Sequence, residues 1–418
     1  MALRGKQKDG LFDLESLEAG IRSSLHNVGG SLLERIINSD GVDYRGVSVS
    51  CGCGSEKQFE GYRDKTLQTV LSNMIIKRAY YHCHVCGEGG VPKDDDLDIK
   101  GTSFSPGIRR MMGLVGAHHP FERGKDFISE LAGIDLTAKA VERTSEEIGD
   151  DLIKRESKTV EGIFSGKIIH FARPIPTGYV MVDGTTVHCT NEWREVKLGC
   201  VFTQAKTDKE GFAVRDEDST TYVGGIQEAQ PFGKRILAEA MTTRGLHQAE
   251  RVVFIADGAR WTWNIADEHF PDAIQVVDLY HAREHLWNLG RELYGTASAK
   301  TTEWVKERHA ELDNGDLESI LQNLKELKPT TENLKEAIRK ETGYFEANKE
   351  RMRYKKFRGM ELFVGSGVIE AGCKTVVGQR LKQSGMRWSV RGANCILTLR
   401  ICQLNNRWED YWEDRKAV

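Results

Sequence analysis

The sequence predicts an α/β fold in which a mixed β-sheet carries helices and is interrupted by a long all-helical segment. Two observations predict it. From residue 168 onward, three strand-like runs are followed by an amphipathic helix, a strand, a helix and another strand. Residues 282–360 then contain helix-forming stretches alone, and a further helix begins near Ser366, a plausible N-cap. A chain of 418 residues is long enough for two or three domains.

The composition is that of a soluble globular protein, with 29% charged residues and a net charge of −3. The first residues, MALRGKQKDG, lack the apolar stretch of a signal peptide, and no run approaches membrane-spanning length. We therefore expect a cytoplasmic protein. The nine cysteines are an odd number in a chain without an export signal, which favours reduced thiols and a metal site over a disulfide framework.

The part of the chain before the sheet divides into three segments. Residues 1–46 are expected to be helical, because apolar positions recur at helical spacing. Residues 47–100 contain flanking cysteines and the pattern of short strands, and residues 101–165 return to helix. Within the last segment, DFISELAGIDLTAKAVERTSEEIG predicts a helix, a tight turn at Gly133 and a second helix from about Leu136.

This helical pair has two interpretations. A helix-turn-helix would present Lys139 and Arg143, one turn apart on the second helix, to the major groove of DNA. A plain helical hairpin with a solvated face fits the same pattern equally well, so the residues alone leave both open.

Four cysteines are spaced as two pairs 30 residues apart: Cys51, Cys53, Cys83 and Cys86. Thiolate pairs from two turns are the usual ligands of a structural Zn²⁺, and CHVCGEGG is similar to a zinc knuckle. The short spacing of the first pair leaves open that His82 or His84 replaces one thiolate. The other five cysteines, with Cys189, Cys200 and Cys373 among them, are expected in the core or in helices.

Three acidic residues lie in elements that are expected to pack together in one domain. The run GYVMVDGTTVHC predicts a buried strand with Asp183 in its middle, where a lone carboxylate costs several kcal/mol unless it is paired. Asp257 closes the strand VVFIAD, and Glu370 lies in the first turn of the late helix. A central strand, its neighbour and a following helix can bring three such side chains to one edge of a sheet.

Clustered carboxylates repel one another unless a cation lies among them. Two Mg²⁺ ions about 3.5–4 Å apart would join the three acids and support phosphodiester cleavage. Ordinary structural roles are the alternative for each residue, because Asp-Gly is a common turn and Glu370 can pair with Lys374 one helical turn on.

The last two segments of the chain differ in character. In residues 282–360, DLESILQNLKELKP places apolar residues on one helical stripe: Leu317, Ile320, Leu321, Leu324 and Leu327. Residues 361–418 contain a stretch with basic but no acidic residues: Lys374, Arg380, Lys382, Arg387, Arg391, Arg400 and Arg407. Such a stretch indicates phosphate contacts, although a solvated helix face is the alternative. Trp388 within it either packs or stacks.

Several stretches between the cysteine segment and the C-terminus resemble one family. They are VDGTTVH, REVKLGCVFTQ, STTYVG, DGARWTWNIADEHFP, QVVDLYHAREHLW, the long run from RMRYKKFRG to NCILTLR, and RWEDYWE. They resemble the DDE transposases of bacterial insertion sequences of the ISKra type and, more distantly, Mutator-like transposases. The resemblance implies an RNase H-like domain of residues 166–281 and 361–418, split by a helical insertion, with Asp183, Asp257 and Glu370 as its catalytic triad.

The wider superfamily also carries a Cys- or Asp-x-x-His motif after the second acid, and Asp278 and His281 of DLYH match it. The resemblance implies a supporting role for this pair, in orienting DNA or a catalytic carboxylate. As an alternative, Asp278 is itself the second metal ligand, because it too ends a buried strand. His285, one turn beyond His281, is expected on the helix surface.

The function implied by the resemblance is DNA transposition. Mg²⁺ or Mn²⁺ would serve hydrolysis at the ends of a mobile element and strand transfer into target DNA. The expected partners are double-stranded DNA and further copies of the chain, as a homodimer or larger, at the nucleoid and not at a membrane. Two alternatives remain: a nuclease of the same fold without strand transfer, and a DNA-binding protein derived from a transposase.

Overall fold

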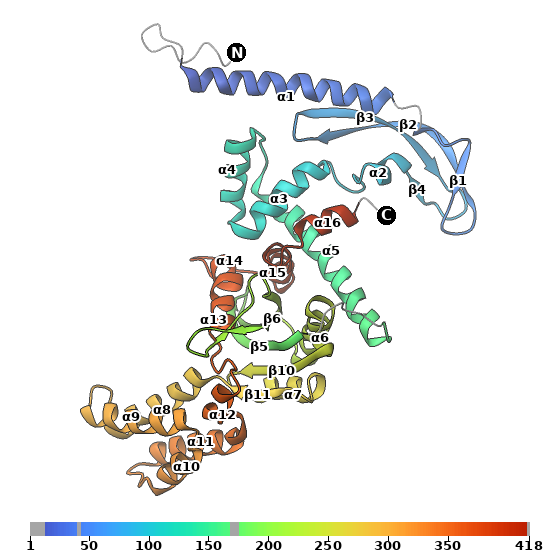
Figure 1. Ribbon diagram of the computed structural model, residues 1–418. Coiled ribbons are helices and arrows are strands. Elements are labelled where there is room, and N and C mark those ends of the chain that lie inside the picture. Colours follow the sequence, from blue (N-terminus) through green and yellow to red (C-terminus); the bar gives the residue numbers. More distant parts are fainter. Residues whose placement is uncertain (1–12, 40–42, 168–174, 416–418) are drawn as a thin grey trace. The chain divides into compact units, whose positions relative to one another are not determined.

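The computed structural model describes residues 13–39, 43–167 and 175–415 (Figure 1). It divides into two compact units, one that runs to Ile148 and includes the C-terminal helix, and one from Gly149 to Arg407. The C-terminal helix was assigned from sequence to the same segment as residues 361–407, and the structure groups it with the first unit instead. The stretch IIHFARP at 168–174, expected to form a strand, lies outside the described residues.

The first unit holds a sheet that, in the described residues, has four antiparallel strands in sequence order. They are β1 (Ser48–Ser50), β2 (Glu56–Gln68), β3 (Asn73–His82) and β4 (Gly89–Gly90). The expectation of short strands is wrong for β2 and β3, which have 13 and 10 residues. Alternate residues of β3 are buried, which keeps a long hairpin in one register. The predicted N-terminal helix is α1 (Leu14–Ser39), whose Leu33 and Ile37 pack on the core around Met74 and Ile76.

Helices complete the first unit. They are α2 (Pro92–Asp96), α3 (Pro106–His118), α4 (Phe121–Ala132), α16 (Trp408–Asp414) and the first part of α5 (Ala138–Phe164). Ser105 caps α3, since its side chain accepts a hydrogen bond from Ile108 N. The predicted helix pair is confirmed: α4 ends at Gly133, which has a φ of 69°, and α5 follows a short link.

The second unit is built on a mixed sheet whose order, within the described part of the chain, is β11-β10-β5-β6-β9 (Figure 1). The strands are β5 (Ile175–His188), β6 (Trp193–Gln204), β9 (Thr221–Gly225), β10 (Ala249–Ala256) and β11 (Ile274–Val277). The first three form an antiparallel meander, and β10 runs parallel to both β5 and β11. The predicted order of elements is therefore confirmed, with a small hairpin of β7 (Lys206–Thr207) and β8 (Ala213–Val214) added.

Helices cover both faces of this sheet. On one face α6 (Ala229–Arg244) approaches β6 at Gly199, where a Cβ atom would lie 2.6 Å from Ile236 Cδ1. On the other face lies α13 (Gly367–Gly372), which contacts the neighbouring Leu198. Helix α6 ends at Gly245 as predicted, with a φ of 61°. Helix α7 (Arg260–His269) links β10 to β11.

Residues 279–359 are helical, as predicted. The helices are α8 (Leu279–Tyr294), α9 (Ala299–Asn314), α10 (Leu317–Glu326), α11 (Glu332–Ala347) and α12 (Tyr354–Gly359), with a 3₁₀ turn, η4, at Lys349–Met352. The apolar stripe of α10 is buried. After α13 come a π-helical turn, η5 (Cys373–Gly378), and helices α14 (Gln379–Leu381) and α15 (Val390–Leu404). No described helix is long and apolar enough to cross a membrane.

Candidate active site and metal centre

Asp183 lies on the central strand β5, just beyond the point where the pairing with the neighbouring strand β10 ends. The parallel pairing of β10 with β5 stops at Ile255 and Met181, whereas β6 continues beside Asp183. Asp257 is two residues beyond Ile255, and Asp183 is two residues beyond Met181. The shared register therefore puts the two aspartates at the same level of the sheet edge.

Local contacts hold each of the three acids. Asp183 is half-buried, and its Oδ1 accepts a hydrogen bond from Gly184 N at 2.7 Å. Asp257 Oδ1 accepts one from Ala259 N at 2.9 Å, which forms the turn into α7. Glu370 is exposed on α13, and its Oε1 accepts one from Ser366 Oγ at 3.0 Å.

The charges of the three acids act on one another. Burial raises the pKa of Asp183 above its ordinary value, and the carboxylates of Asp257 and Glu370 raise it further. A thiol hydrogen bond from Cys373 and the Gly184 N–H act in the opposite direction, because they stabilise the charged form. The structure thus brings Asp257 and Glu370 within range of the charge of Asp183.

The three carboxylates do not form a closed set of ligands. Within the described residues, only the four cysteines bring three or more potential ligand atoms within 4.8 Å of one another. Side-chain rotation would be needed for the acids to converge on a cation, and Glu370 is exposed and held by one hydrogen bond from Ser366, so it has room to rotate.

Asp278 of the DLYH motif is buried, at 3% exposure, and caps α8. Its oxygens accept hydrogen bonds from Tyr280 N, His281 N, and both the N–H and the hydroxyl of Ser366. The Ser366 hydroxyl lies 2.8 Å from Asp278 and 3.0 Å from Glu370, and its single hydrogen serves one carboxylate at a time. These contacts cap α8 and hold Ser366, and they engage both oxygens that the alternative would need for a metal.

The histidines of α8 face the neighbouring helix. His281 is half-buried, and its ring lies 4.9 Å from that of His285. The expectation that His285 lies on the surface is wrong, because α11 covers it: Nδ1 is 2.6 Å from Glu341 Oε2, and the ring stacks on Tyr344 at 3.9 Å. Tyr344 in turn donates a hydrogen bond to the carbonyl oxygen of Asp257 at 3.0 Å.

Sequence reasoning missed two residues of the site. Cys373, expected in the core or a helix, lies half-buried on η5 with Sγ 3.4 Å from Asp183 Oδ2. Its spacing of three residues from Glu370 places both on one helix face, and this signal was available. Tyr344 gives no such signal, since it lies 87 residues from Asp257. Burial raises the pKa of both side chains, and the nearby aspartates raise it further.

The structure separates the basic residues near the C-terminus into two groups. The exposed members are Lys374, Lys382, Arg387 and Arg391. The expectation that Arg380 contacts DNA is wrong, because its side chain is 0% exposed and lies 4.9 Å from the ring centre of Trp388. Burial lowers the pKa of Arg380 to about 10. Trp388 packs inside, with Nε1 donating to Leu381 O, and Arg400 is buried as well.

In the first unit, the expected basic pair is exposed on α5. Lys139 forms an ion pair with Glu142 at 2.9 Å, and Arg143 is also exposed. Both side chains are therefore available to a partner, although exposure alone does not distinguish the helix-turn-helix from a plain hairpin.

The four paired cysteines meet in the first unit and can hold a structural metal such as zinc. Cys51 and Cys53 lie in the turn after β1, and Cys83 and Cys86 in the turn after β3. Sγ of Cys51 is 3.5 Å from that of Cys86 and of Cys53, and Cys53 is 3.7 Å from Cys83. All four sulfur atoms lie within 4.8 Å of one another, which fits tetrahedral thiolate ligation.

The two histidines that were alternatives point elsewhere. His84 Nε2 is 2.9 Å from Glu60 Oε1, and the ring of His82 stacks beside Tyr80. The thiols themselves differ in acidity. Backbone N–H groups, that of Ser55 first, lower the pKa of Cys53 to about 6. A hydrogen bond from the Cys53 backbone lowers the pKa of Cys51, but burial and the other thiols raise it to about 12.

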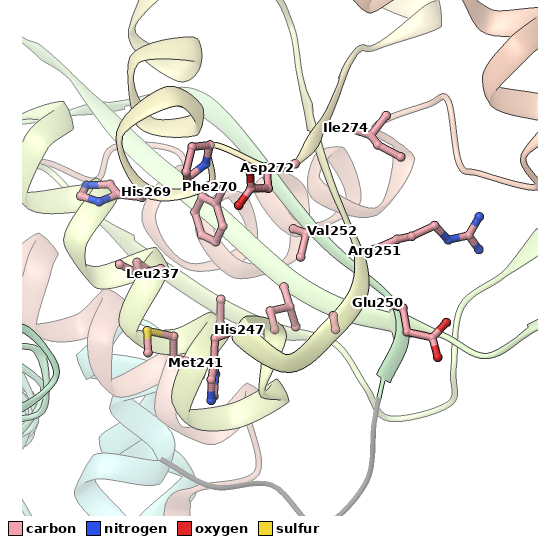
Figure 2. A pocket seen from close by; sticks show the side chains of 15 residues that line it. Leu237, Met241, His247, Glu250, Arg251, Val252, His269, Phe270, Asp272 and Ile274 are labelled. Atoms are coloured by element: carbon pink, nitrogen blue, oxygen red, sulfur yellow. The ribbon is translucent and has the colours of Figure 1, made fainter. Parts of the chain in front are cut away.

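A separate pocket of about 420 Å³ lies at the other end of β10 (Figure 2). It is lined by α6, by the 3₁₀ turn that contains His247, by the start of β10 and by the residues that precede β11, among them His269 and Phe270. Asp257 follows the opposite end of β10, so this pocket is distinct from the acid cluster.

No family model matches this chain, and no curated protein matches it significantly.

Proposed function

We propose that the second unit is the RNase H-like catalytic domain of a DNA transposase, with Asp183, Asp257 and Glu370 as the ligands of Mg²⁺ or Mn²⁺. The observation that carries the proposal is the shared register of β5 and β10, which sets Asp257 level with Asp183. The influence of Glu370 on the pKa of Asp183 supports its assignment as the third acid.

The architecture supports this proposal. A mixed sheet with a parallel pair of strands at its centre, followed by a block of helices before the third acid, agrees with the fold that the resemblance implies. The block corresponds to the insertion, and α11 contributes Tyr344 to the Asp257 turn. Fold agreement alone does not establish a chemistry, and so the acids carry the argument.

The carboxylates suit a divalent cation. Asp183 and Asp257 are half-buried and Glu370 is exposed, so their oxygens border an open surface that a phosphodiester can reach. Hard oxygen ligands are those that Mg²⁺ prefers. When bound, a pair of such ions activates the attacking oxygen and stabilises the leaving one.

The chain's own residues orient these ligands and the DNA. Gly184 N–H and the Cys373 thiol hold Asp183, and the Ser366 hydroxyl lies within hydrogen-bond distance of both Glu370 and Asp278. Exposed Lys374 and Lys382 flank the acids along η5 and α14 and are suited to phosphate contacts. In the first unit, Zn²⁺ on the four thiolates would hold the long β2–β3 hairpin together at its base.

The acids are tested by conservative substitution. Asp183→Asn, Asp257→Asn and Glu370→Gln should each abolish Mg²⁺-dependent cleavage of labelled duplex DNA while the protein still binds that DNA. Asp272→Asn, at an exposed aspartate before β11, is the matched control and should cleave normally. Normal cleavage by any of the three variants would remove that residue from the site.

Strand transfer separates the proposal from its two alternatives. DNA that carries the sequences on both sides of the coding region is incubated with a target plasmid and Mg²⁺. Joined products identify a transposase, whereas cleavage without joining identifies a nuclease. Binding without either reaction identifies a DNA-binding protein derived from a transposase. Two ends have to be joined, so we expect at least two copies of the chain on each productive DNA complex.

A further inference from the structure

A hollow of about 570 Å³ lies beside the far end of β5. One wall is formed by the end of β5 and the start of β6, and the other by residues 381–387, from the end of α14 onward. Backbone hydrogen bonds hold the two walls together. Trp388 N donates to His188 O at 3.2 Å, and Thr190 N donates to Trp388 O at 2.9 Å. The hollow is therefore a built part of the second unit.

The hairpin wall is aromatic. Trp193 is 65% exposed, and its ring lies 5.1 Å from that of His188, directly across the strand pair. An indole exposed on the wall of a hollow presents a flat apolar face on which another ring can stack. The volume falls within the roughly 300–1,000 Å³ of pockets that hold small ligands.

The opposite wall is positively charged. Lys382 and Arg387 both line the hollow and are exposed, and no acidic residue is among its lining residues in the described chain. Lys382 Nζ also donates a hydrogen bond to Thr185 Oγ1, two residues from Asp183. Thr186, which borders the hollow, lies about 10 Å from Asp183 along an extended strand, with its side chain on the opposite face of the strand.

We propose that this hollow binds an unpaired nucleotide of the DNA strand next to the cut, with its base stacked on Trp193 and its phosphate beside Lys382 and Arg387. The inference rests on the proposed function. An aromatic face combined with cations is the arrangement that binds single-stranded DNA without a sequence requirement. A base within a duplex is stacked on both sides, so only an unpaired base offers its face to the indole.

The test uses the full chain and two duplexes with 2-aminopurine at the same position, paired with thymine in one and left without a partner base in the other. Wild-type protein should bind the unpaired duplex about five-fold or more tightly than the paired one, and should quench 2-aminopurine fluorescence. Trp193→Ala should lose both the preference and the quenching, with its affinity for the paired duplex unchanged. Trp193→Phe should keep part of each.

Phe212→Ala is the matched control, because Phe212 is 63% exposed elsewhere in the same unit. It should behave like the wild type. The inference is overturned if wild-type protein binds paired DNA but shows no preference, or if Trp193→Ala retains the preference. Either result leaves the proposed function intact. Failure of the wild type to bind any DNA would instead overturn the proposed function, and the inference with it.

Discussion

The thiol of Cys373 donates a hydrogen bond to the carboxylate of Asp183, although the two residues are 190 positions apart. The contact joins the π-helical turn to the central strand and fixes the orientation of the carboxylate. Single π-helical turns within α-helices occur frequently at functional sites. Here the turn brings the residue three positions after Glu370 onto the first acid.

Removal of this thiol should weaken the site without unfolding the protein. Cys373→Ala loses a hydrogen bond worth roughly 0.5–1.5 kcal/mol, so about 2- to 12-fold more Mg²⁺ should be needed for half-maximal cleavage. Cys373→Ser keeps a donor and should lie closer to the wild type. Thr375→Ala, at an exposed residue on the same turn, serves as the control. Equal Mg²⁺ requirements for Cys373→Ala and the wild type would contradict a positioning role.

Asp183 should destabilise the protein at neutral pH when no divalent cation is present. The pKa of Asp183 is raised in the folded state. The protonated carboxyl group therefore contributes its full stability below the pKa of the unfolded chain, near 3.8. This contribution is lost as the pH rises through the pKa of the folded state. With a chelator, Asp183→Asn should therefore melt a few degrees higher at pH 7, where about 1 kcal/mol corresponds to roughly 2–4 °C. The difference should vanish near pH 3.

Mg²⁺ should reverse the order of the melting temperatures of the wild type and Asp183→Asn. Added Mg²⁺ should raise the melting temperature of the wild type, because a ligand that binds only the folded state stabilises it. It should have less effect on Asp183→Asn. A wild-type melting temperature indifferent to Mg²⁺ would count against a cation among these acids. Asp272→Asn again provides the reference.

Gly258 should not tolerate a side chain. Its φ is 102°, and a Cβ atom there would lie 2.7 Å from Tyr344 Cε2. Gly258→Ala should lower the free energy of unfolding by about 1–3 kcal/mol, measured by urea denaturation. Gly343→Ala, in α11 with open space at its Cβ, should be neutral or slightly stabilising.

The double variant Gly258→Ala with Tyr344→Ala separates the two causes. If the clash dominates, the loss caused by the alanine at position 258 should shrink when the ring is absent. If backbone strain dominates, the loss should stay the same in both backgrounds. No destabilisation by Gly258→Ala in either background would show that the turn is relaxed.

The cysteine cluster should bind one Zn²⁺ and stabilise the first unit. Cys83→Ser or a strong chelator should remove the metal and expose the β2–β3 hairpin to proteolysis. Zinc affinity should fall as the pH is lowered, because protons compete for the thiolates. His84→Ala should retain a full equivalent of zinc, measured by metal analysis. Loss of zinc in that variant would show that the histidine is a ligand.

Arg380 and Lys374 should respond differently to substitution. Arg380→Ala removes a buried side chain and should cost roughly 1–3 kcal/mol of stability. Lys374→Ala should leave stability unchanged but weaken DNA binding for all sequences and reduce the salt dependence of binding by about one charge. Chemical denaturation and binding titrations at several salt concentrations distinguish the two effects.

Local patterns predicted the parts of the fold that depend on neighbouring residues. The helix stops at Gly133 and Gly245 followed from the need for a left-handed backbone there. The strand around Asp183 followed from its apolar and β-branched run, whereas the register that sets it level with Asp257 is seen in the structure alone.

The sequence did not predict which side chains of a helix are covered by elements that are distant in the chain. Arg380 belongs to a basic run, yet its helix face turns toward Trp388. His285 looked like a surface residue, but α11 lies over it and brings Glu341 and Tyr344. Composition and periodicity describe a helix by itself, whereas these contacts follow from tertiary packing.

The block of helices between β11 and α13 also delays the synthesis of Glu370 relative to that of the two aspartates. Asp183 and Glu370 are 187 residues apart (370 − 183), which corresponds to roughly 10 to 40 seconds at 5–20 residues per second. Throughout that time the nascent chain contains at most the two aspartates. For the proposed enzyme, an unfinished chain on the ribosome is therefore incapable of cutting the gene from which it is being translated.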